Sequence, residues 1–524
     1  MKIYKLLLLI ICFYQVKSQV TFQKAYGTSQ SETVSSTEVT YDKGYISAGQ
    51  KMNTSALNIF YGYLQKTDSL GNLLWAKKYN IPGFGFFTNS FETKDKGLIV
   101  SGNTRDSAGI AKDMFLLKTD SLGNVLWAKS YGGSAMDAIC YVIQTSDSGF
   151  VMLGETYSYG VAGQSDIYIV KTDKSGTVQW AHTYGGTGWE KNISINQTSD
   201  GGYFTVGTTT SFNALNSDIY AIKLDANGNV LWSKIFGETQ TDVGEIGLPT
   251  FDGGFLIVSK TLNYDASTWK IGLIKTNSLG DTLWTRTYKK AGATELTAWG
   301  AEQTKDGNYV LVGYLQSTPG HYKGYLLKVD SVGNYMWAHS FTNNQYLYTI
   351  RETADRGLII SSLSDNGLGM GNNDALLIKT NPNGNSGCYQ NTDIPVSGYS
   401  APKISNVTTL TSTGCTSQSI TITTSSNQSS MANICTFIPT SVESYAYPNT
   451  VNVFPNPANK QLFIDANTTE KLTADLYDFT GKQVFSKSMN DKSVIELPDL
   501  TEGIYTLTIK TVDHFITKKI VIRP

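Results

Sequence analysis

The stretch KTDSLGNLLWAKKY (66–79) decides the fold, because near copies return as KTDSLGNVLWAKSY (118–131) and KLDANGNVLWSKIF (223–236). In each copy, a turn rich in Asp, Gly and Asn joins two runs of apolar, β-branched and aromatic residues. This pattern is typical of a β-hairpin whose glycine takes a left-handed conformation, here Gly71 or Gly123. The chain is therefore organised around a repeated hairpin.

Three landmarks give the length of the repeating unit. The Trp of the phrase returns at intervals of 52 or 53 residues, and an Asp before a Gly and an apolar run occurs seven times, as does the Lys that opens the phrase. The Trp residues are Trp75, Trp127, Trp180, Trp232, Trp284 and Trp337; the Asp residues are Asp42, Asp95, Asp147, Asp200, Asp252, Asp306 and Asp355; the Lys residues are Lys66, Lys118, Lys171, Lys223, Lys275, Lys328 and Lys379. Four short strands in each unit of about 50 residues are typical of a propeller blade. We predict an all-β fold whose main domain, residues 19–388, is a seven-bladed β-propeller.

The two ends of the repeat array predict how the ring closes. The seventh phrase, KTN (379–381), is not followed by a Trp strand. At the other end, VTFQKAYG (20–27) aligns with VLWAKSYG (125–132), and Phe22 stands where Trp127 stands. We expect the N-terminal strand to complete the last blade, which removes two exposed sheet edges.

The repeated Trp and Lys are interpreted as structural residues. The Trp is expected to pack between neighbouring blades, because nearly every unit carries it. The Lys should lie across the hairpin from the Trp, as Lys66 does from Trp75 if the loop has four residues. Its stem could then cover the ring while its ammonium group reaches water.

The N-terminus predicts export. Lys2 and Lys5 precede an apolar run from Leu6 to Tyr14, and the small residue Ser18 follows. Residues 1–18 therefore read as a secretory signal peptide, since the apolar run is too short to span a bilayer. No other stretch approaches that length, so no transmembrane segment is expected in the mature chain.

Five cysteines are present, and they allow more than one disulfide. Cys12 leaves with the signal peptide, and Cys140 in an apolar strand is predicted to be a buried free thiol. Among the other three, Cys388–Cys435 and Cys415–Cys435 both stay open. These cysteines flank or lie within residues 389–447, a Ser-, Thr- and Asn-rich segment predicted to be an extended linker.

The C-terminal segment, residues 448–524, resembles the type A sorting domain of type IX secretion substrates in Bacteroidetes. The matching pieces are VFPNPA (453–458), LFID (462–465), ADLYDFTGKQV (474–484), IELPDLTEGIYTLTI (495–509) and TKKIVI (517–522). Their alternating apolar residues also predict a small antiparallel β-sandwich. The resemblance implies passage through the outer membrane by the type IX machinery, usually with removal of this domain, followed by release or surface attachment. It places the sorting signal at Pro455, Asn456, Pro457, Gly481, Gly503, Tyr505, Lys518 and Lys519.

The repeats resemble secreted Bacteroidetes propellers with DGGY and KTD–GN–W phrases. They are also similar to quinone-cofactor propeller repeats and to the sialidase Asp-box, but the spacing differs from both, as Asp225, Gly228 and Trp232 show. Neither a cofactor nor a glycosidase activity is therefore carried over from those families.

Composition and motifs exclude several classes of function. The net charge is −1, with 42 basic and 43 acidic residues, so no basic field would attract nucleic acid. The four His have no metal-ligand spacing, and no P-loop, G-x-S-x-G or H-E-x-x-H motif occurs. No cofactor is expected, and an enzymatic function stays uncertain.

Two features suggest a ligand site on the propeller. Asp137, Glu190 and Asp242 recur with Glu32 at the start of the innermost strand, and the acid is displaced to Glu295 in a later unit. They could hold a cation or a sugar hydroxyl, or they could cap loops by accepting backbone N–H bonds. Trp189 and Trp299 break the repeat and are predicted in fourth-to-first-strand connections, on the same face as Tyr157, Tyr159, Tyr264, Trp269 and Tyr322.

These features give three hypotheses for the function. The first is a secreted or surface-attached, non-catalytic protein that binds an extracellular glycan or protein. The second is a polysaccharide-degrading enzyme with a carboxylate pair at the propeller channel. The third is a structural adhesin that associates with itself.

Overall fold

The computed structural model describes residues 19–523 in two compact units, residues 19–438 and residues 439–524. The signal peptide predicted at 1–18 lies outside the described residues. So do residues 54–58, 82–84, 106–110, 161–163, 213, 215, 238, 263–267, 342–344, 366–372, 389, 394–395, 399–402, 407–409, 414–415, 420–422, 427–429, 438–451, 466–471, 479–482, 491–492, 511–514 and 524.

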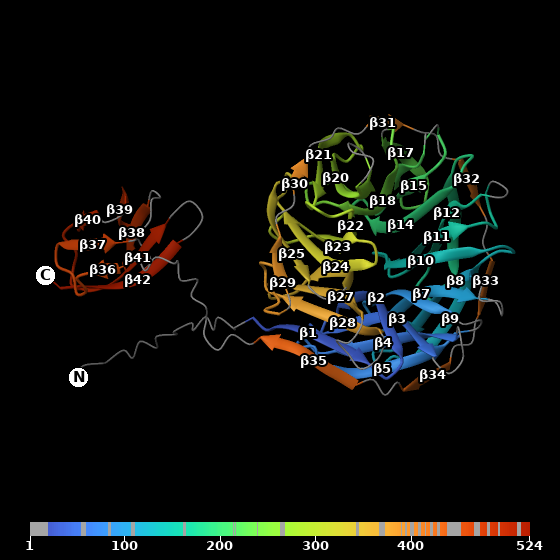
Figure 1. The fold of residues 1–524 in the computed structure, drawn as a ribbon, viewed down its shortest axis with the longest axis horizontal. Coiled ribbons are helices and arrows are strands. Elements are labelled where there is room, and N and C mark those ends of the chain that lie inside the picture. Colours follow the sequence, from blue (N-terminus) through green and yellow to red (C-terminus); the bar gives the residue numbers. More distant parts are fainter. Residues whose placement is uncertain are drawn as a thin grey trace, which may run out of the picture. The chain divides into compact units, whose positions relative to one another are not determined.

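The first unit is a ring of seven antiparallel sheets, the seven blades (Figure 1). The innermost strands, blades 1 to 7, are β2 (Ser31–Val39), β6 (Phe86–Glu92), β10 (Asp137–Gln144), β14 (Glu190–Gln197), β18 (Asp242–Pro249), β22 (Glu295–Gln303) and β26 (Gln345–Glu352). The second strands are β3 (Tyr45–Asn53), β7 (Leu98–Arg105), β11 (Phe150–Thr156), β15 (Tyr203–Thr209), β19 (Phe255–Thr261), β23 (Tyr309–Thr318) and β27 (Leu358–Asp365). The third strands are β4 (Ile59–Thr67), β8 (Ala111–Thr119), β12 (Asp166–Thr172), β16 (Asp218–Leu224), β20 (Lys270–Thr276), β24 (His321–Val329) and β28 (Asn373–Thr380). The fourth strands are β5 (Leu73–Asn80), β9 (Val125–Gly132), β13 (Val178–Gly185), β17 (Val230–Gly237), β21 (Thr282–Lys289), β25 (Tyr335–Phe341) and, in blade 7, β1 (Thr21–Gly27).

The N-terminal strand closes the ring, as the sequence predicts. β1 pairs with β28 and places Phe22 opposite Lys379, just as β5 places Trp75 opposite Lys66. All seven residues of β1 are buried. The seven-bladed propeller fold is thus confirmed, together with the topology of its last blade.

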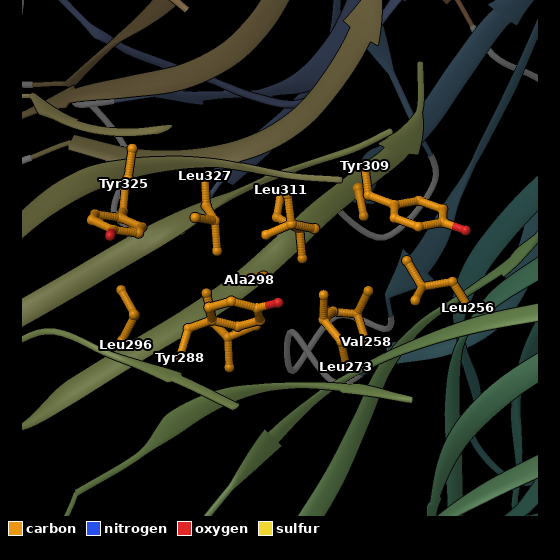
Figure 2. Close-up of a cluster of buried hydrophobic side chains, with 14 of the residues drawn as sticks. Leu256, Val258, Leu273, Tyr288, Leu296, Ala298, Tyr309, Leu311, Tyr325 and Leu327 are labelled. Carbon is orange, nitrogen blue, oxygen red and sulfur yellow. The ribbon is translucent and has the colours of Figure 1, made fainter. Parts of the chain in front are cut away.

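Apolar side chains between neighbouring blades form the core. Figure 2 shows the contact between blades 5 and 6, where Leu256, Val258 and Leu273 face Leu311 and Leu327. A buried Tyr at the end of the fourth strand adds a polar link between several pairs of blades. The Tyr hydroxyl donates to the Gly carbonyl of the next hairpin turn in Tyr26–Gly71, Tyr79–Gly123, Tyr131–Gly176, Tyr184–Gly228 and Tyr288–Gly333.

The repeated Trp also lies between blades, but it is only half-buried. Trp75, for example, packs against Gly123 of the next hairpin turn, where a Cβ atom would stand 3.0 Å from the indole ring. The cation over this ring belongs to Lys77, whose Nζ lies 5.8 Å from the ring centroid. In blades 3 and 6 the same position holds His182 and His339, whose rings lie 5.2 and 5.1 Å from Trp180 and Trp337.

The repeated Lys lies across the hairpin from the Trp as predicted, but its ammonium group does not reach water. Lys223 is buried and pairs with Asp200, the repeated Asp of the preceding turn, at 2.9 Å. The same ion pair occurs in every blade: Lys66–Asp42, Lys118–Asp95, Lys171–Asp147, Lys223–Asp200, Lys275–Asp252, Lys328–Asp306 and Lys379–Asp355. The expectation of a solvated ammonium group is wrong, because the turn that carries the Asp folds back beside the third strand.

Most of the segment predicted to be a linker, 389–447, instead contributes strands to a belt around the propeller, while residues 389 and 438–447 lie outside the described residues. Residues 390–437 add a fifth, outermost strand to every blade (Figure 1). In chain order these strands pair with blades 6, 5, 4, 3, 2, 1 and 7, and they are β29 (Gln390–Asp393), β30 (Val396–Gly398), β31 (Lys403–Asn406), β32 (Leu410–Thr413), β33 (Thr416–Ser419), β34 (Thr423–Ser426) and β35 (Ser430–Phe437). The linker interpretation failed because polar composition alone does not show that the seven outer edges have backbone groups to pair.

The second unit is a small antiparallel sandwich of two sheets. The strands are β36 (Asn452–Phe454), β37 (Gln461–Asp465), β38 (Leu472–Tyr477), β39 (Gln483–Met489), β40 (Ser493–Glu496), β41 (Gly503–Lys510) and β42 (Phe515–Ile522). Leu462, Leu476, Leu507 and Ile520 lie in its apolar core. Within the described residues of the chain, no helix has the length and apolar character needed to cross a membrane.

The predicted sorting-signal residues occupy different environments in this sandwich. Pro455, Asn456 and Pro457 are exposed, and Asn456 Oδ1 accepts a hydrogen bond from the Val521 N–H at 2.8 Å. Tyr505 is buried. Gly503 opens β41, Lys518 and Lys519 lie in β42, Lys518 is exposed, and Gly481 lies outside the described residues.

Candidate functional site

Every innermost strand carries a β-bulge at the same level. Pairing with the second strand skips one residue in six blades, and in blade 3 it skips Ile139 and Cys140. The single bulge residues, in blade order, are Ser35, Thr88, Ile193, Glu245, Trp299 and Tyr348. A bulge re-aims a side chain without breaking the sheet. One scaffold position therefore carries a different side chain in each blade, beside the axis of the ring.

Blades 6 and 7 use this level to build the aromatic cluster, defined here as Trp299, Tyr314, Tyr322, Tyr346 and Tyr348. The Trp299 ring lies nearly parallel to Tyr346 and to Tyr348, with centroids 5.7 and 5.6 Å away. Tyr314 meets Trp299 edge-on at 4.7 Å and Tyr322 edge-on at 5.3 Å. Four of the rings are half-buried, and Tyr314 is buried. The cluster therefore offers partly exposed ring surface held in a fixed arrangement.

An ion pair from blades 5 and 6 borders the aromatic cluster. The Tyr314 hydroxyl donates to Glu295 Oε1 at 2.7 Å, and the same oxygen pairs with Lys260. The Lys260 ammonium lies 4.4 Å from the centroid of the Trp269 ring. Trp269 is tied to the start of β22, because its carbonyl accepts from the Leu296 N–H at 3.0 Å. A chain of contacts thus links the aromatic cluster through Glu295 and Lys260 to Trp269 of blade 5.

Glu245, the bulge residue of blade 5, adds a second carboxyl to this region. Burial raises the pKa of Glu245 to about 7, although Lys260 and Lys191 act in the opposite direction, and Glu295 raises it further. A carboxyl with such a pKa is partly protonated at neutral pH and can donate as well as accept a hydrogen bond.

A separate ionic group lies at the other end of the innermost strands. Arg351 of β26 binds Glu38 of β2 through two hydrogen bonds, Nε–Oε2 at 2.7 Å and Nη2–Oε1 at 2.5 Å. Burial raises the pKa of the nearby Glu302 to about 7, with Arg351 opposing the shift. A bidentate pair between blades 7 and 1 therefore fixes the seam of the ring from the inside.

Asp137 and Glu190, two of the acids predicted to bind ligand, are buried and hydrogen-bonded to their own blade and to the loop that enters it. Asp137 accepts from Ser158 Oγ and the Gly133 N–H, at 2.7 and 2.6 Å. Glu190 accepts from Thr209 Oγ1 and the Gly186 N–H, at 2.6 and 3.0 Å. The loop-capping role considered beside ligand binding is thus observed at both residues. A direct ligand role for them stays a prediction.

Asp242 lies close to a second carboxyl, that of Asp218, much as Asp137 and Glu190 lie close to Asp113 and Asp166. Burial, and then the charge of Asp242, raises the pKa of Asp218 to about 6. Both side chains are buried, and Asp218 Oδ1 has no hydrogen-bond partner in the structure.

The two predicted Trp residues do not lie in equivalent places. Trp189 is half-buried in the connection before β14, as predicted, and its backbone exchanges hydrogen bonds with Thr210. Trp299 lies within β22 rather than in a connecting loop, because this strand begins at Glu295, before the bulge. Tyr264 lies outside the described residues.

Sequence reasoning missed Tyr314, Tyr346, Tyr348, Lys260 and Glu245. These residues lie on three blades, between the recurring Trp, Asp and Lys positions, so the repeat pattern does not single them out. An alignment of the seven innermost strands on their bulges would have shown small residues in blades 1 and 2 and aromatic residues in blades 6 and 7. Among the residues placed by the structure, His, Cys, Asp and Glu side chains form no group of three or more suited to a metal ion.

Comparison with known protein families identifies the C-terminal domain. Residues 452–523 match the family described as the secretion system C-terminal sorting domain. A search of curated proteins finds no sequence match. A protein of unknown function from Bacteroides caccae is similar in structure, with 13% identity, a TM-score of 0.34, and coverage of 53% of this chain and 89% of that chain.

Two further structures are similar over most of their length. PorZ, a surface component of the type IX secretion system of Porphyromonas gingivalis, has 7% identity and a TM-score of 0.19, and the match covers 95% of this chain and 100% of that chain. An exo-β-1,3-galactanase from Phanerochaete chrysosporium has 11% identity and a TM-score of 0.27, with 77% and 97% covered. At these TM-scores, the likenesses carry no argument about ligands. The sorting-domain match and the ring of seven blades together identify the chain as a β-propeller protein with a type IX secretion C-terminal sorting domain, directed to the cell surface or outside the cell.

Proposed function

We propose that this exported propeller binds an extracellular glycan at the aromatic cluster of blades 6 and 7. One observation carries the proposal: Trp299 and Tyr348 occupy a bulge position that Ser35 and Thr88 fill in blades 1 and 2. Because the same scaffold forms with small residues there, packing of the blades does not require the aromatic rings. Large aromatic side chains at such a position are best explained by a ligand.

The chemistry of the surrounding surface favours a carbohydrate. Sugar rings present an apolar C–H face and a rim of hydroxyl groups, so their sites combine aromatic faces with a few fixed polar groups. Here the partly exposed rings of Trp299 and Tyr348 supply the faces, and Glu295 and Lys260 supply charged hydrogen-bonding groups. The acceptor and the donor are already paired with one another, so they are held in place before a ligand arrives.

Glycan binding by the chain 19–524 tests the proposal, first on an array of extracellular polysaccharides and then by calorimetry with the best ligand. Loss of an aromatic anchor typically costs 2 kcal/mol or more, so Trp299→Ala and Tyr348→Ala should weaken binding by roughly 30-fold. Trp189→Ala is the matched control, since it removes a half-buried Trp outside the cluster. Binding that survives Trp299→Ala but is lost with Trp189→Ala would move the site to the blade 4 loops.

The carboxyls Glu245 and Glu295 favour polysaccharide hydrolysis as a second candidate. Glycoside hydrolysis needs one protonated and one ionised carboxyl group. Burial raises the pKa of Glu245 to about 7, whereas Glu295 is ion-paired with Lys260. Release of reducing ends from a bound polysaccharide, abolished by Glu245→Gln while binding remains, would establish this activity. If the native protein binds the polysaccharide but releases no reducing ends, non-catalytic glycan binding remains the proposed function.

A further inference from the structure

The belt makes one complete circuit of the propeller, against the order of the blades. The belt follows β28, the third strand of blade 7, in the sequence. Its strands pair with blades 6 to 1 in turn, and the last of them, β35, pairs with β1 in blade 7. Each intermediate strand is short, whereas β35 pairs along the whole of β1 from Thr21 to Gly27. The two ends of the circuit therefore lie in the same blade.

Gln23 of β1 is a neighbour of both ends. Its Nε2 atom donates to the Cys388 carbonyl at 2.7 Å, and its backbone is in register with Cys435 of β35. Cys388 is buried and disulfide-bonded. Cys435 is thus the cysteine that the strand pairing brings to this place.

The strands that contain Cys140 or flank Cys415 in the sequence belong to distant blades. Cys415 lies in the sequence between β32 and β33, which pair with blades 3 and 2. Cys140 belongs to β10, the innermost strand of blade 3. A disulfide requires Cα atoms within about 7 Å. Cys140 lies too far around the ring from Cys388 to meet this limit, and the strands that flank Cys415 in the sequence pair with blades 3 and 2.

We infer that Cys388 is bonded to Cys435, so that residues 388–435 form a covalently closed hoop around the seven blades. The hoop would make the seam of the ring sensitive to the redox state of its surroundings. β1 lies between β28 and β35, and the disulfide joins the segments that continue from these two flanking strands. The disulfide then holds β1 in place between β28 and β35, and its reduction allows β35 to separate from β1.

Mapping of the native chain 19–524 tests the connectivity directly. Free thiols are alkylated under denaturing, non-reducing conditions, and the digest is analysed by mass spectrometry before and after reduction. We expect one cross-linked pair of peptides, containing Cys388 and Cys435, and alkylated Cys140 and Cys415. A Cys388–Cys415 peptide, or an alkylated Cys435, would overturn the inference.

Stability of the same chain tests whether the disulfide holds β1 in place. The Cys388→Ser/Cys435→Ser variant should melt roughly 5–10 °C lower than the native chain. Backbone amides of β1 should exchange with solvent at least tenfold faster, and a reducing agent should produce both effects in the native chain but not in this variant. Cys415→Ser is the matched control and should change neither value. If the backbone amides of β1 exchange at equal rates in the oxidised and reduced native protein, the disulfide does not hold β1 in place, whether or not the variant folds.

Discussion

At the scale of single residues, the repeat is held by a buried cation that each blade neutralises in the same way. Lys223 and Asp200 show how much of this the sequence could predict. Their recurrence was visible, and so was the position of the Lys opposite the Trp. Their contact was not, because it depends on how the turn before β15 folds back on β16.

The ion pair predicts unequal effects of removing either partner. Asp200→Ala leaves the Lys223 ammonium buried and unpaired, and we expect a loss of about 3 kcal/mol. Lys223→Met leaves Asp200, which is more than half exposed, free to be hydrated, and should cost about 1 kcal/mol. Chemical denaturation of both variants measures the difference. Equal losses would show that the buried ammonium group does not need its carboxylate.

The same pairs predict sensitivity to acid. Burial would raise the pKa of Asp200, but hydrogen bonds from Thr198, Lys223 and the Gly202 N–H lower it to about 2. Because this pKa lies below the value in the unfolded chain, the pair stabilises the fold above about pH 4 and loses this effect as the pH falls towards 2. Seven such pairs should give a steep acid transition in that range, observable by circular dichroism.

Asp218 predicts the opposite dependence on pH. Burial and the charge of Asp242 raise the pKa of Asp218 to about 6, above its unfolded value, so the fold loses stability as the pH rises from about 4 to 6. Asp218→Asn should therefore stabilise the chain by up to about 2 kcal/mol at pH 8 and have little effect at pH 4. Asp225→Asn is the control, because hydrogen bonds lower the pKa of that turn residue and its loss should destabilise at pH 8. No gain at pH 8 for Asp218→Asn would argue against repulsion between the two buried acids.

At the scale of elements, the bulges modify the innermost edge of each blade, and the belt pairs its outermost edge. The innermost edge bends through a bulge, which frees one side chain per blade for variation. The outermost edge has to be paired or otherwise protected, and the belt supplies a strand for each fourth strand. Strand periodicity could not reveal the belt, since its strands are only three or four residues long in six blades.

The belt predicts where the propeller ends. A chain of residues 19–388, the boundary that the repeats suggest, exposes the outer edges of all seven blades. We expect it to aggregate and to melt well below the chain 19–438, which keeps the belt. Analytical ultracentrifugation and calorimetry on the two chains give the comparison. Equal melting temperatures and a monomeric short chain would show that the belt is dispensable for the fold.

At the scale of the whole molecule, the chain combines a rigid ring with a separate sandwich that has its own core. Sequence reasoning predicted both, because the landmarks of the repeat and the phrases of the sorting domain are local. It recognised Trp299 as an exception to the repeat but expected it in a connecting loop, whereas Trp299 lies within β22. It could not assemble the aromatic cluster, whose members come from two blades and meet only when the ring is closed.

Two separate cores predict that the sorting domain can be removed without loss of the propeller. Leu462, Leu476, Leu507 and Ile520 pack within residues 439–524, whereas the blades pack on one another. The chain 19–438 should therefore melt at the temperature of the propeller transition in the chain 19–524, and the second, smaller transition, that of the sandwich, should be lost.

In the producing bacterium, the precursor 1–438 should instead stay behind the outer membrane, because residues 452–523 carry the sorting domain. Cell fractionation measures where the precursor is found, and calorimetry measures whether the propeller is folded. Surface delivery of 1–438 would show that the propeller itself contains a sorting signal, and a lowered propeller transition would show that the two units stabilise one another.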